Sequence, residues 1–430
     1  MSRARPALPE GPYLVVGLAR SGQAAARMLR EYGTVLACDA GRVEVPAGVD
    51  AVLESDGLEL LERAACVVKS PGVPRQAPVV AAALERGVPV HGELELAWRL
   101  LPNRFLAVTG TNGKTTTAEL LGAIHMEAGQ PVAVAGNVGT PLSSLVGSLT
   151  PEAAVVCEVS SFQLEDATAF APEVGVILNL EEDHLDRHGT VAAYRTAKLS
   201  LFARQSEGDA AVSPPGMELP GRARRVTFGG AGSDLELDGE GLVWRGGALL
   251  ELSELRLRGA HNAENAMAAA AAALVAGIEP DPVRGALRTF AGVSHRLEEV
   301  ADVRGVLYVN DSKATNVAAA RRGIEAFQGG VHAILGGSLK GGGFAGLREP
   351  VSQRCRACYL VGQAAERLEA DLAGTVELHR AGSLEPAVAA AAHAARPGDV
   401  VLLSPACASF DQYSDYEERG EHFRRLVPRG

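Results

Sequence analysis

The chain of 430 residues is 47% apolar and 4% aromatic, a composition typical of a folded, water-soluble protein, and its length predicts two or three domains. The formal net charge of −11 argues against a nucleic-acid-binding protein, which needs clustered basic surface, and leaves any anionic ligand to local cations. Six cysteines are too few for a disulfide framework. No apolar core of signal-peptide length follows the basic residues of the N-terminal segment, and the longest apolar run, from Ala266, is too short for a membrane span. We therefore expect a cytoplasmic protein that does not insert into membranes.

Lysine is unusually rare in this chain, because 36 of the 41 basic residues are arginine. A lysine that persists against this bias can be one that arginine cannot replace, either as a compact point charge or as a reactive amine. Five positions are thereby nominated before any motif is considered: Lys69, Lys114, Lys198, Lys313 and Lys340.

The N-terminal region alternates predicted strands with predicted helices, which indicates a Rossmann-like parallel sheet. Apolar strands are expected at 13–17, 34–39 and 66–72, with a helix at 21–33. The turn "GLARSG" from Gly17, followed by Asp39, resembles a dinucleotide fingerprint, but Ala19 replaces the second glycine. The turn therefore predicts either the nicotinamide site of a dehydrogenase or a loop for a different diphosphate.

A glycine-containing loop joins the next predicted strand, 104–110, to a helix expected at 116–129. Its sequence, Gly-Thr-Asn-Gly-Lys-Thr-Thr, is two residues shorter than the usual nucleotide loop. Backbone N–H groups at a helix N-terminus bind phosphate, a lysine reaches the terminal phosphates, and a threonine hydroxyl can ligate Mg²⁺. The predicted nucleotide-phosphate site comprises Gly110, Thr111, Asn112, Gly113, Lys114, Thr115 and Thr116.

Acidic and histidine side chains follow two further strands, expected at 153–160 and 174–180. Glu158 ends the first of them, where a carboxylate could take a metal ion held by the phosphates. His184 and His188 have the spacing of a zinc protease, but Leu185 stands where the glutamate base belongs, so we expect His184 to join a Mg²⁺ site instead. Lys198 by itself predicts only a cationic contact.

The remainder of the chain predicts short antiparallel strands or loops at 205–250, a helix at 262–278, and a third alternating region from 293. In that region three polar segments each follow an apolar strand: "NDSKATN", "LGGSLKGG" and "LLSPACASFDQYSDYEERG". Open α/β sheets bind ligands at strand carboxyl ends, so these segments predict a ligand site. The alternative is that Asp311 and Ser404 simply cap helices. Cys355 and Cys358 have C-x-x-C spacing, which we interpret as structural.

We thus predict an α/β protein of three modules, 1–93, 94–292 and 293–430: a Rossmann-like sheet, a P-loop-type ATP-binding domain and a second Rossmann-like domain. Several motifs resemble the Mur ligase family, whose phosphate loop has the short form "TGTNGKTT". "HNAENA", "SHR", "SPG", "DSKATN" and the long C-terminal motif also match, and the last three are most similar to the branch that adds D-glutamate. The "DNPR" signature of the diaminopimelate- or lysine-adding branch is not found.

The resemblance implies a monomeric ATP-dependent ligase that joins D-glutamate to UDP-N-acetylmuramoyl-L-alanine through an acyl phosphate, with two Mg²⁺ ions and a carbamylated lysine. Metal-site roles fall to Thr115, Glu158, His184 and Lys198 as the carbamate, and catalytic roles to Lys114, Lys198, His184 and Glu158. Contacts to ATP, beyond the loop, fall to Asn262, Asn265, Arg296, Asp311 and Lys313. Contacts to the UDP-linked substrate fall to Arg20, Ser21, Asp39, Ser70, Gly72, Asn137 and Ser160, and contacts to D-glutamate to Thr315, Lys340, Ser409 and Tyr416.

The sequence departs from the family pattern in the uridine region. Ala19 and Arg20 stand in a loop that is usually richer in glycine, and Ala40 and Gly41 replace a Thr-Arg pair. Three other functions stay open: a dehydrogenase, recognised by hydride transfer; a nucleotide-switched regulator, recognised by slow ATP hydrolysis without an amino acid; and a folate-using amide ligase of the same family.

Overall fold

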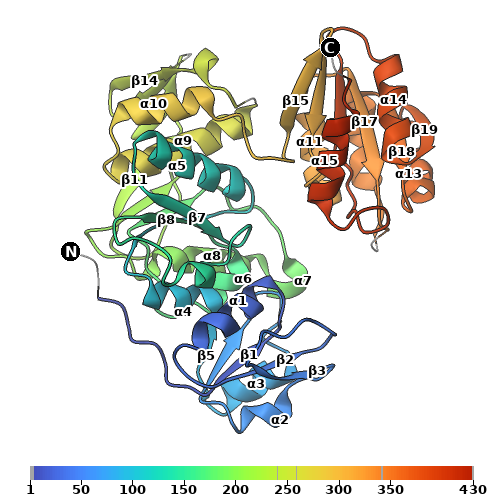
Figure 1. Cartoon of the computed structure of the whole chain (residues 1–430). Helices are drawn as coiled ribbons and strands as arrows, with labels where there is room; N and C mark the ends of the chain where they lie inside the picture. The colour runs from blue at the N-terminus through green and yellow to red at the C-terminus, as the bar shows by residue number, and fades with distance from the viewer. Residues whose placement is uncertain (1–3, 240, 258, 340–341, 429–430) are drawn as a thin grey trace. The chain divides into compact units, whose positions relative to one another are not determined.

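The computed structural model describes residues 4–239, 241–257, 259–339 and 342–428, which belong to two compact units, Met1–Phe290 and Ala291–Gly430. Each unit is built of largely parallel sheets covered by helices (Figure 1), so the predicted α/β class is confirmed. The boundary between the units lies two residues before the predicted boundary at 292, and the division into three modules stays a prediction.

The first sheet of the N-terminal unit has five parallel strands in the order β3-β2-β1-β4-β5. Its elements are β1 (Tyr13–Val16), α1 (Arg20–Leu29), β2 (Val35–Asp39), β3 (Asp50–Leu53), α2 (Leu58–Leu61), β4 (Cys66–Lys69), α3 (Pro78–Glu85) and β5 (Val90–Gly92). The strand order reverses between β1 and β4, which opens a crevice at their carboxyl ends. A Cβ atom on Gly22 would lie 1.8 Å from the Gly17 carbonyl oxygen, so this helix-to-strand contact requires glycine.

The second sheet of this unit has nine strands, β14-β13-β12-β11-β10-β9-β6-β8-β7. The strands are β6 (Arg104–Thr109), β7 (Val132–Gly136), β8 (Ala154–Glu158), β9 (Val174–Ile177), β10 (Ala210–Ser213), β11 (Arg224–Gly229), β12 (Leu235–Asp238), β13 (Gly241–Trp244) and β14 (Gly247–Glu251). The helices are α5 (Lys114–Glu127), α6 (Ser161–Glu165), α7 (Leu185–His188), α8 (Val191–Ala203), α9 (Ala260–Val275) and α10 (Pro280–Thr289), with a 3₁₀ turn, η1 (Leu142–Leu145). Antiparallel strands occur at 235–251, as expected, whereas β10 and β11 are parallel.

One apolar core joins these two sheets. The helix α4 (Glu93–Leu100) is shorter than the expected 91–104 and supplies Leu94, Leu96 and Trp98 to a cluster that also contains Val15 of β1 and Phe105 of β6. The predicted boundary at 93 therefore falls within a shared core and not in an exposed linker.

The C-terminal unit contains one six-stranded sheet, β15-β16-β20-β17-β18-β19, in which only the β15–β16 pair is antiparallel. Its strands are β15 (Glu298–Val303), β16 (Val306–Asn310), β17 (Val331–Gly336), β18 (Cys355–Val361), β19 (Glu377–Gly382) and β20 (Val400–Leu403). Its helices are α11 (Val317–Glu325), α12 (Arg348–Arg354), α13 (Ala365–Leu372), α14 (Leu384–Ala394) and α15 (Tyr416–Leu426). Apolar clusters cover both faces, as the unbroken burial of β17 and β20 requires.

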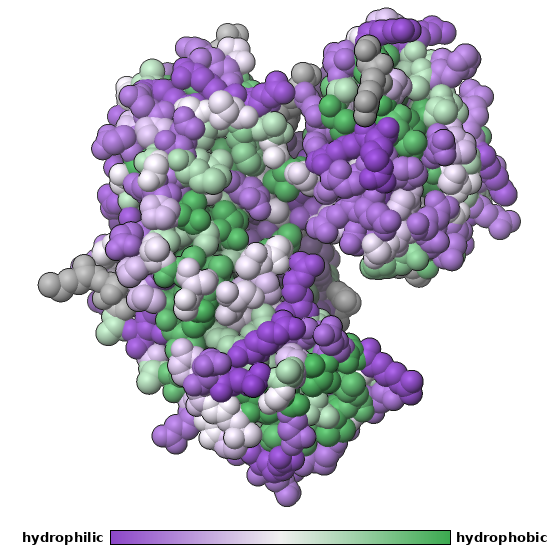
Figure 2. All heavy atoms as spheres, viewed as in Figure 1, coloured by the Kyte–Doolittle hydropathy of each residue, from purple (hydrophilic) through white to green (hydrophobic). Residues whose placement is uncertain are grey.

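Polar residues dominate much of the face shown in Figure 2, and an apolar area lies over the first sheet, near α2 and α3. Leu58 of α2 and Leu84 of α3 are among the exposed large apolar side chains of the described residues. No helix of the described residues has the length and apolar character that crossing a membrane requires.

Candidate active site

The short phosphate loop lies between β6 and α5, at the point where the strand order of the second sheet reverses. Gly113 has φ +82°, and a Cβ atom there would lie 2.0 Å from Oδ1 of Asn265, so the loop touches α9 at a distance that only glycine permits. The N–H of Asn112 donates to Oδ1 of Asn179 at 2.8 Å, which fixes the loop against the segment after β9. The loop is therefore held in shape by neighbouring side chains.

Two ammonium groups meet at this loop. Nζ of Lys114 donates to the carbonyl oxygens of Gly110 and Thr111, both at 2.9 Å, and Nζ of Lys198 donates to the same Gly110 oxygen at 2.8 Å. Lys198 is 2% exposed, and burial, followed by the nearby Lys114 cation, lowers its pKa to about 7. The loop thus has two amines on one carbonyl oxygen, and burial leaves that of Lys198 partly neutral near pH 7.

A carboxylate and a hydroxyl lie directly beside the loop. Oγ1 of Thr115, in the first turn of α5, donates to Oε2 of Glu158 at 2.8 Å, and Nδ2 of Asn137 donates to Oε1 of the same carboxylate at 3.1 Å. Thr115 and Glu158 are both buried. Adjacent hydroxyl and carboxylate oxygens are ligands that Mg²⁺ prefers, so this pair fits a magnesium ion shared with phosphates.

His184 lies at the other side of the loop, in an aromatic group. Its ring is 4.9 Å from the Phe162 ring and 6.3 Å from the Tyr194 ring, while the Tyr194 hydroxyl bonds Oγ1 of Thr111 at 2.9 Å. His188 instead faces Glu165 at 3.0 Å and Oγ of Ser161 at 3.0 Å. The His188 ring also lies 5.3 Å from the Phe162 and Tyr194 rings, so the two histidines share these aromatic neighbours and differ in their polar partners. The described residues contain no group of three His, Cys, Asp or Glu side chains suited to a metal.

The asparagines of "HNAENA" lie on the first turns of α9. Nδ2 of Asn265 donates to Oδ1 of Asn262 at 3.3 Å, and Asn265 is buried against Gly113. The structure thus brings this motif to the phosphate loop, within the N-terminal unit.

The predicted uridine and substrate residues gather at the carboxyl ends of β1, β2, β4 and β8. The Asp39 carboxylate accepts from the N–H of Leu18 at 2.6 Å and from that of Gly41 at 2.8 Å, so it holds two loops. Oγ of Ser70 donates to the Gly17 carbonyl oxygen at 2.7 Å. The remaining members are placed as follows: Ser21 in the first turn of α1, Arg20 with NH1 3.2 Å from the Gly139 oxygen, Gly72 exposed, and Ser160 as the N-cap of α6.

In the C-terminal unit the three polar segments follow β16, β17 and β20, which are adjacent in the sheet. Oδ2 of Asp311 accepts from Oγ of Ser404 at 2.7 Å, and Oδ1 accepts from the N–H of Leu297 at 3.2 Å. Burial raises the pKa of Asp311 to about 7, against the opposite effect of the Ser404 hydroxyl. The helix-cap alternative is wrong for both residues, because Asn316 and Asp415 cap α11 and α15.

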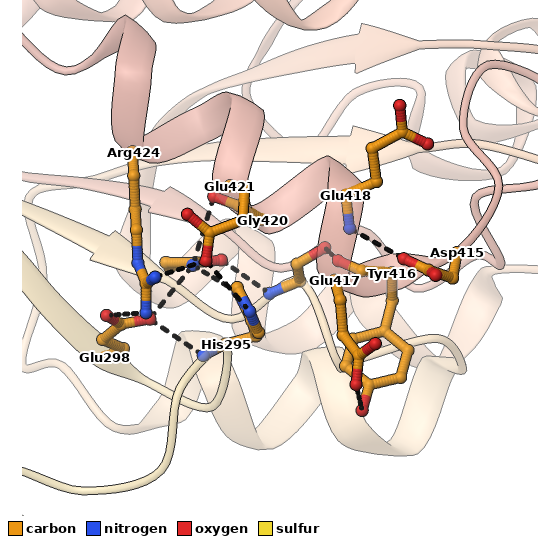
Figure 3. A network of polar contacts seen from close by, with 11 residues as sticks. His295, Glu298, Asp415, Tyr416, Glu417, Glu418, Gly420, Glu421 and Arg424 are labelled. Carbon is orange, nitrogen blue, oxygen red and sulfur yellow. Dashed lines mark hydrogen bonds and ion pairs between the residues drawn. The ribbon is translucent and has the colours of Figure 1, made fainter.

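A polar network surrounds His295 and joins the "SHR" segment to α15 (Figure 3). His295 has φ +62°, its Nδ1 is 2.9 Å from Nδ2 of Asn310, and its N–H donates to Glu298 at 2.8 Å. Glu298 in turn bonds Arg424. A Cβ atom on Gly420 would lie 2.1 Å from the His295 ring, so the ring packs directly on the helix backbone. Arg296 follows this strained residue and is half-buried.

A buried guanidinium underlies the predicted amino-acid site. Arg419 donates to the oxygens of Ser312, Ala408 and Cys407, and burial lowers its pKa to about 10. The predicted ligand residues stand around these segments: Nζ of Lys313 is 5.7 Å from the Tyr416 ring, Thr315 is half-buried, and Ser409 is buried. Lys340 lies outside the described residues.

Sequence reasoning missed Asn179, Tyr194, Asn310 and Arg419, which contact the loops described above. It also missed Arg187, whose guanidinium donates to the carbonyl oxygens of the loop after β4. Tyr194 could have been found, because it precedes Lys198 by four residues and so shares its helix face. The others act through partners far away in the chain, which no local pattern reveals.

Comparisons with known proteins agree with this geometry. The profile of the Mur ligase middle domain matches residues 108–273, and that of the Mur ligase glutamate ligase domain matches residues 295–407. A UDP-N-acetylmuramoylalanine–D-glutamate ligase of Acidobacterium capsulatum is 43% identical, over 96% of this chain and 95% of the relative. Proteins of the same name from Anaeromyxobacter dehalogenans and Geobacillus kaustophilus are 43% and 39% identical, over 99% and 96% of this chain and of each relative.

Solved structures show the same fold at low identity. UDP-N-acetylmuramate–alanine ligase of Thermotoga maritima aligns with a TM-score of 0.61 at 18% identity, over 97% of this chain and 99% of the other. A second Thermotoga maritima ligase, solved with ADP, aligns with a TM-score of 0.60 at 18% identity, over 97% and 94%. With full-length relatives near 40% identity, the chain belongs to the Mur ligase family.

Proposed function

We propose that this protein joins D-glutamate to UDP-N-acetylmuramoyl-L-alanine with hydrolysis of ATP to ADP and phosphate, a step of peptidoglycan precursor synthesis. The observation that carries the proposal is the match to ligases of that name at 39–43% identity over 96% of the chain. The phosphate loop supports its ATP half. Because ATP and nucleotide-linked precursors are cytoplasmic compounds, we expect the reaction to occur there, catalysed by a monomer.

In the proposed reaction an oxygen of the acceptor carboxylate attacks the γ-phosphorus of ATP, and ADP leaves. The amine of D-glutamate then attacks the carbonyl carbon of the acyl phosphate, loses a proton, and the tetrahedral intermediate expels phosphate to leave an amide. The protein contributes mainly position and charge to such chemistry. Lys114 supplies a point charge at the β and γ phosphates, and the loop N–H groups face the same anion.

Thr115 and Glu158 would hold one Mg²⁺ ion and His184 a second, and bound magnesium would neutralise charge on the phosphates. Asn137 would orient both Glu158 and the acceptor. Lys198 fits carbamylation for a physical reason: its buried amine has a pKa of about 7, and a neutral amine is the form that reacts with CO₂. The carbamate would replace a second buried cation beside Lys114 with an anion.

In the C-terminal unit, Arg296, Asp311 and Lys313 would contact the nucleotide, and Thr315, Lys340, Ser409 and Tyr416 would contact D-glutamate. The positive Arg419 beneath these segments supports an anionic ligand, since its hydrogen bonds go to a hydroxyl and carbonyl oxygens. Arg20, Ser21, Asp39, Ser70, Gly72 and Ser160 would surround the UDP-linked substrate.

The function is tested by phosphate release in the presence of ATP, UDP-N-acetylmuramoyl-L-alanine and a panel of amino acids. We expect release only with D-glutamate. Lys114→Ala should lower this rate by at least about a hundredfold, the usual cost of removing charge stabilisation of a transition state. ATP hydrolysis that is independent of amino acids would favour the switched regulator, and turnover with a folate acceptor would favour the other ligase.

A further inference from the structure

The loop Ser70–Val73, after β4, is held by two cations, Lys69 and Arg187, that have no role in the proposed reaction. Nζ of Lys69 donates to the carbonyl oxygen of Val73 at 2.9 Å and lies 3.4 Å from that of Ser70. The Arg187 guanidinium donates to the oxygens of Pro71 at 3.0 Å, Gly72 at 3.1 Å and Val73 at 2.5 Å. Four successive carbonyl groups therefore face two positive charges.

Arg187 lies in the segment that follows β9 of the second sheet and contains His184. It lies on α7, three residues after His184, and its guanidinium carbon is 4.5 Å from the centroid of the Phe162 ring on α6. The same Phe162 ring lies 4.9 Å from His184. The Arg187 guanidinium thus contacts both the Ser70–Val73 loop and the Phe162 ring, which lies beside the predicted metal ligand His184.

The loop is open at Gly72, whereas Pro71 has no N–H and the Val73 N–H donates to the Ser70 carbonyl oxygen at 3.0 Å. No heavy atom lies within 4 Å of the position of a Cβ atom on Gly72, whereas the Ser70 hydroxyl is used by Gly17. Three cations, Lys69, Arg75 and Arg187, stand here with two carboxylates: Asp166, which is 2.7 Å from Lys69 and 3.1 Å from Arg75, and Glu165, whose charge also acts on Lys69. The local charge is therefore positive, as a pyrophosphate requires in a chain of net charge −11.

We propose that Arg187 is a positioning residue that sets the backbone at Gly72 for the pyrophosphate of the nucleotide-linked substrate and fixes its position relative to the His184 segment. This inference rests on the proposed function. A lysine should not replace Arg187, because an ammonium group has no planar face that can stack on Phe162 while it donates to the loop.

The test uses the full-length protein with Arg187→Met, Arg187→Lys and the matched control Arg75→Met. Arg75 belongs to the same contact, where its guanidinium bonds Asp166 at 3.1 Å and the Glu165 oxygen at 2.8 Å. We expect both Arg187 variants to raise the KM for UDP-N-acetylmuramoyl-L-alanine by about tenfold or more, and to leave the KM for ATP within about twofold. Arg75→Met should change neither by more than about twofold.

Calorimetric affinity for UDP alone provides a reading that does not depend on turnover, and we expect the same loss of about tenfold in both Arg187 variants. Unchanged acceptor KM and UDP affinity in Arg187→Met would overturn the proposal, as would full recovery in Arg187→Lys. An equal rise of both KM values with a lowered Tm would show a merely structural role and also overturn it. If the wild-type protein binds UDP but forms no amide, the proposed function fails while the affinity comparison still tests Arg187.

Discussion

At the scale of single residues, two members of the proposed site are buried groups whose usual charge is disfavoured: the amine of Lys198 and the carboxyl of Asp311. Burial is the leading cause in both cases, and it acts against the charged form of each group. The protonation state of each group therefore leads to a testable prediction.

Lys198 should carry CO₂ covalently. Its amine, with a pKa of about 7, is largely neutral at pH 8, whereas an exposed lysine is not. Intact-mass and ¹³C NMR measurements in ¹³C-bicarbonate should show one carbamate at pH 8, which Lys198→Met abolishes. Lys313→Met provides a control and should keep the carbamate, because Lys313 lies in the C-terminal unit. A free Lys198 amine in the metal- and nucleotide-saturated protein would contradict the prediction.

Asp311→Asn should raise the free energy of unfolding more at pH 8 than at pH 5. The carboxyl pKa is raised to about 7, so the native state binds the proton more tightly than the unfolded chain, and stability is lost as pH rises through about 7. An asparagine avoids this loss and can still bond both Leu297 and Ser404. Because the unfolded carboxyl is already ionised at pH 5, the difference between the two pH values should approach about 1.4 kcal/mol for each of the roughly two pH units between 5 and the native pKa of about 7. Urea unfolding at both pH values checks this, and a pH-independent difference would refute it.

At the scale of elements, the two sheets of the N-terminal unit are joined by β4 and α6. Lys69 ends β4, and Asp166 follows the last residue of α6; their charged atoms are 2.7 Å apart, and both side chains are buried. The sequence analysis nominated Lys69 by the rarity of lysine, yet gave it no partner. Its partner is 97 residues away, and only the fold brings the two together.

Lys69→Met should destabilise the protein by about 3–5 kcal/mol, because it leaves the Asp166 carboxylate buried with only the exposed Arg75 as an ionic partner. The double variant Lys69→Met/Asp166→Leu should recover much of that loss, since no unpaired charge remains. Denaturant unfolding of the three proteins measures both effects. If Lys69→Met lowers the free energy of unfolding by less than about 1 kcal/mol, the Lys69–Asp166 pair is not what joins these elements.

Local sequence patterns predicted most strands, the phosphate loop and the three polar segments after β16, β17 and β20. They succeeded because buried strands and glycine turns carry their signal within a few residues. The Thr115–Glu158 pair was partly predictable, since both residues end or begin elements that meet at one sheet edge. Arg187, Asn310 and Arg419 were not, because each is defined by carbonyl oxygens or side chains brought near by tertiary packing.

At the scale of the whole molecule, three modules were predicted and two compact units are observed. Three modules would need a separate apolar core on each side of residue 93, whereas the structure has one core that spans this position. Leu94, Leu96 and Trp98 of α4 belong to the cluster that also contains Tyr13 and Val15 of the first sheet. A chain cut at 93 would lose that helix and expose the apolar face it covers. The C-terminal unit, by contrast, has clusters on both faces of its sheet composed of its own residues.

A fragment 291–430 should therefore fold alone, with a cooperative thermal transition and native-like amide dispersion in NMR spectra. A fragment 1–93 should not, because burial of its sheet needs side chains from beyond residue 93. Extending that fragment to 290 provides the matched control, since it restores the shared core and should restore the transition. Cooperative folding of 1–93 would support the three-module division at 93, and failure of 291–430 would show that its two clusters are insufficient. The comparison thus decides whether the first sheet and the phosphate loop fold as one unit. The contacts of Lys69 and Arg187, which link the two sheets, lead us to expect that they do.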